Sequence, residues 1–487
     1  MDNVNGIDFV IILGYFAVLI TVGYFAMKKA KSGEDYLVAS RRLPLPIFIC
    51  AMSATVLGGG STLGGAALSY EAGIGGIWLN GMYFISIFLL ALLLGTKLSN
   101  MRILSTSEGM GVFYGPYARL LAALVNLIYL VMLAVLQVVG MGSIISTIIG
   151  VSPQVGMVIG GCVILVYILL GGMWAVAMTD VMQVVIMTIG VIILVPVFAL
   201  PAVGGFDGLT QALPETHFDV TDVGFQRIIA YVLLLVPGFL AGQDFWQKAF
   251  TAKNKKVATK GTMIASFYIL IYGFGIILLG MCVYAVNPNL PDTNAVFAAG
   301  ALAFMPSGLK GLMLAAALAA IMSTANGGIL GSATVFYNDL LKSRVNIPKN
   351  KEVLVNRILC VIVTIIAVVF ALYVQSVLVA LDVAYAYIAG CLFVPLIFAF
   401  ILKRVSAKAG FFSLIASFIT VTFFFIKNGI TALEPIIFGI IVSAVVFFTI
   451  NFIDSKKREI TFDENGQVII EGKEQTGKEA IENNNIN

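Results

Sequence analysis

Residues 50–73 read CAMSATVLGGGSTLGGAALSYEAG, an apolar segment with a run of three glycines at positions 58–60. Glycine in a helix interior costs about 1 kcal/mol relative to alanine, so a helix through this run is weakened at its middle. A break there would free backbone carbonyls, which must be buried against protein or line a cavity. Close helix packing through small side chains is the alternative explanation. The segment therefore predicts either a broken helix or a tight helix contact.

The chain around this segment is strongly apolar, with 60% hydrophobic and 11% charged residues in 487. Soluble domains carry about 25% charged residues, and one water-soluble core cannot hide this much apolar surface. We therefore expect lipid as the solvent and helices as the spanning form, because backbone groups in lipid must be satisfied within the segment. The start, MDNVNGIDF, lacks the basic region of a removable signal peptide, so the first span is expected to remain.

Thirteen apolar stretches are long enough to cross the ~30 Å hydrocarbon layer as helices. They lie near residues 7–27, 45–67, 76–99, 118–149, 153–173, 178–202, 226–250, 260–287, 307–341, 352–375, 377–402, 409–426 and 431–453. With this count, 26 of the 29 lysines and arginines fall on one side of the membrane, which leaves Arg227, Lys310 and Lys427 on the other. Basic loops stay cytoplasmic. We expect a multi-pass protein of the cell membrane with its N-terminus outside and its C-terminus inside.

The chain ends in a polar segment that differs in composition from the spans. Residues 459–487 are rich in Glu and Asn, and such an end is expected to be solvated and loosely ordered. We therefore predict a transmembrane transporter domain over residues 1–458 and a short cytoplasmic tail over 459–487. The tail is too short for an output domain.

A second candidate break lies in the seventh span, where Pro237-Gly238 is followed by Ala241-Gly242-Gln243-Asp244. Breaks in the second and seventh spans, five spans apart, are typical of inverted repeats. The two halves would be spans 2–6 and 7–11, each opening with a discontinuous helix. Carbonyls freed at such breaks are oxygen ligands suited to Na⁺.

Four motifs occur in order along the chain: KSGEDYLVASRRLP at 31–44, YILLGGMWAVAMTDVMQ at 167–183, GQDFWQKAFTAKN at 242–254 and AAIMSTANGGILGSATVFYNDLL at 319–341. Each alone is weak. Together, and on the expected spans, they make the chain resemble the sodium:solute symporter family over nearly its whole length. The resemblance implies the leucine-transporter-like fold, an all-α membrane protein with two inverted five-helix repeats.

The resemblance also implies one sodium site between the second and ninth spans. Its ligands would be the carbonyls of Ala54, Leu57 and Ala320 and the hydroxyls of Ser323 and Thr324. The last three residues lie at i, i+3 and i+4, so they share one helix face. The alternative for the two hydroxyls is a hydrogen bond to their own helix.

Asp180 opens the sixth span, and the resemblance places it on the cytoplasmic exit path of sodium. Helix capping is the alternative role for this carboxylate. Some family members hold a second sodium with this acid and a serine three residues beyond the Thr324 position. Gly327 stands there in this chain, so one sodium per substrate is expected.

The resemblance places the substrate pocket at mid-membrane beside the second-span break. The candidate residues are Ser61, Asn80, Tyr83, Gln137, Gln243, Asp244, Asp382 and Tyr385. Hydrogen bonds between helices are the alternative use of these polar groups. Asp244 or Asp382 could face a substrate ammonium group, whereas Lys248, four residues after Asp244, could neutralise that acid instead. Val56 and Gly242 stand where the choline-transporting branch has tryptophans, which ranks choline below an amino acid or small carboxylate.

These observations predict a secondary transporter that couples Na⁺ to the uptake of a small organic solute by alternating access. A proton-coupled transporter using Asp180 or Asp382, and a membrane solute sensor, are the alternatives. No HExxH motif or nucleophile–base pair is present, and His217 is the one histidine, so an enzyme is not expected. The expected partners are Na⁺, the solute and lipid, without nucleic acid, in a monomer or weak homo-oligomer.

Overall fold

The computed structural model describes most of the chain. The described residues are 4–27, 39–94, 103–342, 344–345, 347–348, 351–402, 404–430, 432–462, 468–470 and 473–474. Three predicted features lie wholly or partly outside these ranges. They are residues 31–38 of the first family motif, the basic residues within 28–31 and within 97–102, and most of the predicted tail.

The described chain is almost entirely helical. The long helices are α1 (Gly6–Met27), α5 (Ile77–Leu94), α7 (Pro116–Ile149), α8 (Pro153–Met187), α11 (Phe225–Ala241), α13 (Lys255–Val286), α15 (Leu309–Val335), α16 (Glu352–Val374), α19 (Ala407–Asn428) and α20 (Glu434–Ile453). Shorter helices are α3 (Leu45–Val56), α4 (Gly65–Ala72), α6 (Thr106–Tyr114), α9 (Leu200–Ala202), α10 (Gly205–Ala212), α12 (Gln243–Ala249), α14 (Val296–Phe304), α17 (Val377–Tyr387) and α18 (Phe393–Ile401). Short 3-10 and π-helical turns join them: η1 (Ala39–Arg41), η2 (Gly60–Gly64), η3 (Gly73–Gly76), η5 (Thr188–Ile193), η6 (Val195–Ala199), η7 (Glu215–Phe218), η8 (Thr293–Ala295), η9 (Phe336–Leu341) and η11 (Ile388–Leu392).

Ten helical stretches of the described chain are long and apolar enough to cross a membrane, and eleven when the bent pair α11 and α12 is counted as one span. The protein is therefore an all-α membrane protein with ten or eleven candidate spans. Three further apolar helical stretches of the described chain are shorter than a full span, namely Leu45–Val56, Pro153–Leu169 and Thr293–Phe304. The count of thirteen stays a prediction.

Three of the helices are interrupted at glycines. Helix α3 ends at Val56, and helical structure resumes at Gly60 after the glycine run. Inside α8, Gly172 has φ 57° and ψ −162°, a left-handed conformation that separates two helical halves. Helices α11 and α12 meet at Gly242 with a 43° bend.

The break between α11 and α12 lies later in the chain than Pro237-Gly238, the dipeptide that first suggested a break in this span. Helix α11 runs through Pro237 and Gly238 and ends only at Ala241. A Cβ on Gly238 would lie 2.4 Å from Cδ1 of Tyr385, so this glycine allows close helix packing rather than a break.

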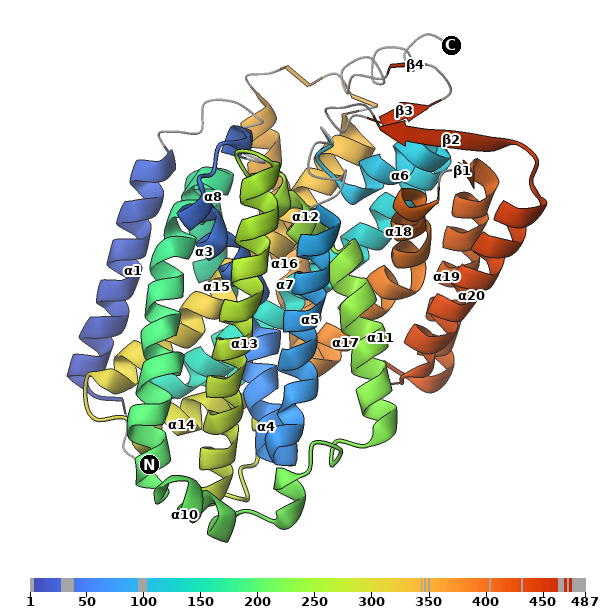
Figure 1. Ribbon diagram of the computed structural model, residues 1–487. Coiled ribbons are helices and arrows are strands. Elements are labelled where there is room, and N and C mark those ends of the chain that lie inside the picture. The colour runs from blue at the N-terminus through green and yellow to red at the C-terminus, as the bar shows by residue number, and fades with distance from the viewer. Residues whose placement is uncertain are drawn as a thin grey trace.

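Helix α15 lies at the centre of the bundle, and nearly all of its residues are buried. It packs against α7, α8, α1 and α3, and Figure 1 shows it enclosed by neighbouring helices. We call the end of the bundle that carries α6 and the strands the α6 face, and the end that carries α10 and the start of α1 the α10 face (Figure 1).

A small antiparallel sheet covers part of the α6 face. Its strands are β1 (Arg404–Ser406), β2 (Lys457–Phe462), β3 (Val468–Ile470) and β4 (Lys473–Glu474), in that order. Strand β1 belongs to the loop between α18 and α19 and pairs Val405 with Arg458. The described part of the tail, which was expected to be loosely ordered, is thus attached to β1 by backbone hydrogen bonds. Its polar composition does not reveal this pairing.

We expect Asp8→Asn to destabilise the fold by about 1–2 kcal/mol. The buried Asp8 carboxylate accepts hydrogen bonds from the N–H groups of Gly308 (2.7 Å) and Gly311 (3.0 Å), so it caps the start of α15 from a separate helix. Thermal unfolding of the purified protein measures the loss. Asp207→Asn removes an exposed first-turn acid of α10 and is the control, and an equal effect of both changes would contradict the capping role.

Candidate functional site

The break between α3 and η2 leaves two carbonyls without their helical partners. The N–H of Gly58 donates to Val56 O at 3.0 Å and so does not reach Ala54. The N–H of Gly59 donates to a glutamine side chain of α7 at 2.9 Å instead of to Thr55. The carbonyl oxygens of Ala54 and Thr55 are therefore available to other groups.

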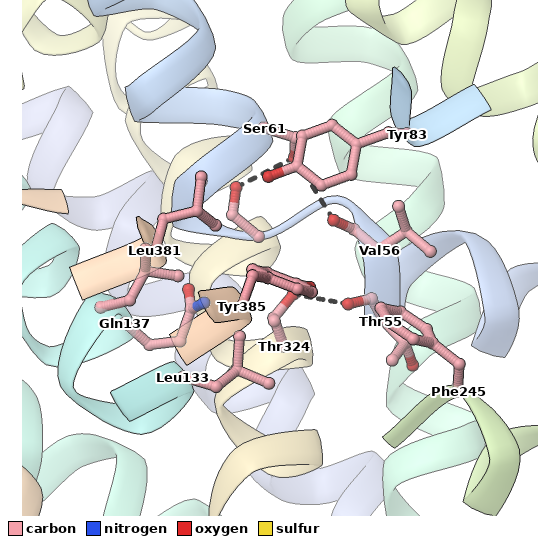
Figure 2. Close-up of a pocket in the computed structure, with 13 residues that line it drawn as sticks. Thr55, Val56, Ser61, Tyr83, Leu133, Gln137, Phe245, Thr324, Leu381 and Tyr385 are labelled. Atoms are coloured by element: carbon pink, nitrogen blue, oxygen red, sulfur yellow. Dashed lines mark hydrogen bonds between the residues drawn. The ribbon is translucent and has the colours of Figure 1, made fainter. Parts of the chain in front are cut away.

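Two hydroxyls of α15 fill this gap. Ser323 Oγ lies 2.8 Å from both Ala54 O and Ala320 O. Thr324 Oγ1 lies 3.0 Å from Thr55 O and 3.4 Å from the other two carbonyl oxygens. We call these five oxygens the oxygen cluster; Figure 2 shows its Thr324–Thr55 bond. The buried cluster contains two hydroxyl protons for three carbonyl oxygens, so it has more acceptors than donors. Such an oxygen-rich composition suits a bound cation.

The structure thus brings together four of the five predicted sodium ligands. Each hydroxyl reaches its own helix at Ala320 and also crosses to α3, so the predicted hydrogen bond within the helix is present, while the sodium role stays a prediction. Thr55 was missed by the sequence analysis, although its place beside Ala54 at the break was the available signal. Leu57 lies in the break, where its N–H donates to Ser53 O, and its carbonyl makes no described contact with the hydroxyls.

We expect Gly58→Ala to weaken sodium binding at least ~10-fold. A Cβ at this position would lie 2.4 Å from Thr324 Oγ1 and 2.6 Å from Thr324 Cβ, so α15 and the break would have to separate. The measurement is a Na⁺ titration of thermal stability. Gly81→Ala on α5 is the control, because its Cβ would meet its neighbours at an ordinary 3.5 Å. Equal behaviour of the two variants would remove the steric argument.

A small cavity lies directly beside the oxygen cluster, and Figure 2 shows the side chains around it. It encloses no more than about 230 Å³ of empty space. Four of the eight predicted substrate residues line it, namely Ser61, Tyr83, Gln137 and Tyr385. The other lining residues are Thr55, Val56, Gly58, Gly60, Leu133, Leu136, Phe245, Thr324 and Leu381. Thr55 and Thr324 belong both to this wall and to the oxygen cluster.

Gln137 connects the helix break to the cavity. Its Oε1 accepts the hydrogen bond from Gly59 N–H at 2.9 Å, whereas its Nε2 has no hydrogen-bond partner among the described residues. Nearby, Ser61 Oγ donates to Gly58 O at 3.2 Å. A buried donor without a partner is costly, so the Gln137 amide is ready to bind an acceptor on a ligand.

Aromatic rings form one side of the cavity. Phe239 stacks on Tyr385 (centroids 5.1 Å apart) and on Phe245 (4.4 Å), and meets Tyr83 edge-on at 4.9 Å. Tyr129 contacts Tyr385 at 5.3 Å. The sequence analysis missed Phe239, Phe245 and Tyr129, because a chain with 34 phenylalanines and 17 tyrosines gives no local signal for these three.

The remaining polar candidates lie away from the cavity wall. Asn80 faces α4, where a Cβ on Gly65 would meet its amide nitrogen at 2.6 Å. Gln243 accepts from Thr106 N–H at 2.7 Å and donates to Leu104 O at 3.2 Å, so it connects α12 to the start of α6. Asp382 is partly buried and is not among the lining residues.

Asp180 forms a buried ion pair with Lys248. The distance from Lys248 Nζ to Asp180 Oδ2 is 2.6 Å, with both side chains at most 2% exposed. The capping interpretation of Asp180 is wrong, because the residue lies well inside the helical half that follows the Gly172 kink. The expectation that Lys248 could neutralise Asp244 is also wrong, since its ammonium group contacts the other acid.

Asp244 lies at the start of α12 and is 1% exposed. Its Oδ1 accepts a hydrogen bond from Tyr129 Oη at 2.8 Å. Its Oδ2 has no hydrogen-bond partner in the part of the chain that the structure describes. Asp180 and Asp244 therefore differ in their surroundings, one being paired with a lysine and the other not.

Comparison with known proteins gives a consistent result. Residues 36–417 match the model of the sodium:solute symporter family. The sodium/pantothenate symporter of Escherichia coli (strain K12) is 26% identical over 346 residues, which cover 68% of this chain and 71% of that protein. The osmoregulated proline transporter OpuE of Bacillus subtilis (strain 168) is 23% identical over 480 residues, covering 94% and 97% of the two chains.

Solved structures agree with the helical architecture. A Na⁺-coupled sialic acid symporter in a substrate-bound, outward-open state superimposes with a TM-score of 0.79 at 19% identity, covering 93% of this chain and 99% of that one. MhsT in complex with L-phenylalanine gives a TM-score of 0.55 at 12% identity, covering 84% and 99%. At these identities the likeness shows the fold alone, which is leucine-transporter-like.

Proposed function

The chain belongs to the sodium:solute symporter family, so it is a sodium-coupled transporter rather than an enzyme, and on this premise we propose that it carries a small amino acid or carboxylate into the cell. The observation that carries the proposal is the shared wall between the oxygen cluster and the cavity. Thr55 and Thr324 contribute to both. A cation bound at the cluster would hold the helix break in one arrangement, and the same break shapes the solute cavity.

Such a shared element is what coupling requires. Each ligand favours the conformation in which the break is ordered, so each raises the affinity for the other by the same factor. Na⁺ is the coupling ion in this family. We propose the carbonyls of Ala54, Leu57 and Ala320 and the hydroxyls of Ser323 and Thr324 as its ligands, with Thr55 O as an added candidate.

We also propose the finer topology, with thirteen spans and two inverted five-helix repeats. Each repeat would open with a broken helix, α3–α4 in the first and α11–α12 in the second. The α6 face would be cytoplasmic and the N-terminus outside. Support comes from the basic residues, of which 26 of 29 fall on one side in this topology.

One Na⁺ per solute is the proposed stoichiometry. Gly327 replaces the hydroxyl that a second site would require, and the Lys248 ammonium group already neutralises Asp180. Asp180 would then act on the sodium exit path only when that ion pair opens.

The solute is proposed to be small. Relatives are named for pantothenate, proline, glucose and choline, so membership of the family leaves the solute open. The cavity holds no more than about 230 Å³ of empty space, which leaves little room for a large solute. None of its described lining residues is charged, and Gln137, Tyr83 and Tyr385 supply its polar side-chain atoms together with Ser61 and threonine hydroxyls.

The test is thermal stability of the purified protein at constant ionic strength, in Na⁺ or in K⁺, across a panel of amino acids, hydroxy acids, sugars and amines. We expect a stabilising solute to act in Na⁺ and to lose its effect in K⁺. A solute that stabilises the protein equally in both salts would overturn sodium coupling at this site.

A further inference from the structure

Asp244 is a buried acid that forms no salt bridge among the described residues. One oxygen is held by Tyr129 and the other has no hydrogen-bond partner among the described residues. An isolated carboxylate at membrane depth is destabilising, and such residues face bundle interiors or ligand pathways. The charge therefore calls for a cationic partner that arrives from outside the protein.

The protein's own nearby cation is used elsewhere. Lys248 follows Asp244 by one helical turn, yet its Nζ lies 2.6 Å from Asp180 Oδ2. This pair is almost fully buried, and no described contact joins Lys248 to Asp244. Asp180 thus has a lysine partner in this structure, and Asp244 has none among the described residues.

The unpaired oxygen lies behind the cavity wall. An ideal Cβ on Gly327 would lie 3.8 Å from Asp244 Oδ2 and 3.8 Å from Thr55 Cγ2, so the carboxylate and the cavity-lining threonine meet at the same glycine of α15. Phe245, the residue after Asp244, also lines the cavity. Thr55 and Phe245 therefore separate the carboxylate from the cavity, and contact with a solute requires these side chains to move aside.

The surroundings favour an organic ammonium group. Tyr129, which donates to Asp244, lies against Tyr385 of the cavity wall at 5.3 Å, and Tyr385 is stacked on Phe239. Aromatic rings attract ammonium groups when both are desolvated. Asp382, the other sequence candidate for this role, is partly exposed, whereas Asp244 is 1% exposed, and neither acid is among the lining residues.

We propose that Asp244 binds the ammonium group of the transported solute, which makes the cargo an amino acid or another amine rather than a carboxylate without an amino group. The inference rests on the proposed function, because it takes the cavity as the solute site. The Gln137 amide, and the Na⁺ at the oxygen cluster, would then bind the hydrogen-bond acceptor group at the other end of the same solute.

Matched solute pairs test the inference on the unaltered protein. L-Alanine is compared with L-lactate, and L-valine with L-2-hydroxyisovalerate, by thermal stability in Na⁺. We expect a shift with an amino acid and none with its hydroxy analogue. An equal shift from both members of a pair would overturn the inference while leaving sodium-coupled transport intact, whereas no dependence on Na⁺ for any solute would overturn the proposed function instead.

Asp244→Asn tests the residue itself. We expect binding of the active amine to weaken by about 100-fold, because a buried charge loses its partner. Stabilisation by Na⁺ alone should change by less than about two-fold. In the control Asp222→Asn, which lies in an exposed loop, both amine binding and stabilisation by Na⁺ should also change by less than about two-fold. Amine binding that survives in Asp244→Asn, or is lost equally in the control, would overturn the assignment.

Discussion

Replacing Thr324 by alanine is expected to raise the Na⁺ concentration needed for half-maximal solute uptake by roughly 10- to 100-fold, and Ser323→Ala should do the same. Each change removes one oxygen from the oxygen cluster, and a contact to a charged group is worth about 1.5–3 kcal/mol. The hydroxyls also close the break, since they reach Ala54 O at 2.8 Å and Thr55 O at 3.0 Å. Uptake into proteoliposomes as a function of Na⁺ is the measurement.

Ser332→Ala is the matched control for both variants. Ser332 is also a buried serine of α15, but its Oγ donates to Gly328 O of its own helix at 2.7 Å. It should therefore keep the normal Na⁺ dependence. If Ser323→Ala and Thr324→Ala are indistinguishable from this control, the oxygen cluster is not the sodium site.

Replacing Lys248 by methionine is expected to destabilise the protein by about 3–5 kcal/mol, because it leaves the Asp180 carboxylate buried without its partner. The pair is 2.6 Å long and at most 2% exposed, so water cannot replace the ammonium group. It also joins α12, the short half of the bent pair, to α8. The thermal unfolding midpoint and the yield of folded protein should both fall.

The double variant Asp180→Asn/Lys248→Met separates the cost of an unpaired charge from the loss of packing. With neither charge present, most of the stability should return, since neutral replacement of a buried pair is often tolerated. Lys255→Met, at an exposed position of α13, is the control for the loss of a lysine. A double variant as unstable as Lys248→Met alone would show that the ion pair is not the cause.

Part of the candidate site was predictable because its determinants are local. The glycine run at 58–60 weakens a helix wherever it occurs, and the i, i+3, i+4 spacing puts Ala320, Ser323 and Thr324 on one face of any helix. The family resemblance then paired the two segments. The carbonyl of Thr55 was not predicted as a member of the oxygen cluster. Which carbonyls are left without a helical partner depends on the N–H groups of Gly58 and Gly59, which turn away from the helix in the break.

The solute side was less predictable. Tyr83, Gln137 and Tyr385 line the cavity as expected, whereas Gln243 is held by Thr106 and Leu104 near α6. A polar residue in an apolar span reveals that it needs a partner, but not whether the partner is a ligand or another helix.

By itself, the sequence of this protein determined the membrane environment, the helical form and the helix break, because hydropathy and backbone hydrogen bonding act over a few neighbouring residues. Only the tertiary structure decided that Lys248 forms its ion pair with Asp180 rather than with Asp244, which is four residues away. It also decided that Phe245 lines the cavity and that Phe239 and Tyr129 pack against the lining ring of Tyr385. The physical reason is that such contacts depend on how each helix is rotated and packed against helices from distant parts of the chain. A charged or aromatic side chain of one helix contacts a side chain of another helix across the bundle, and the spacing of residues along the sequence does not predict which one.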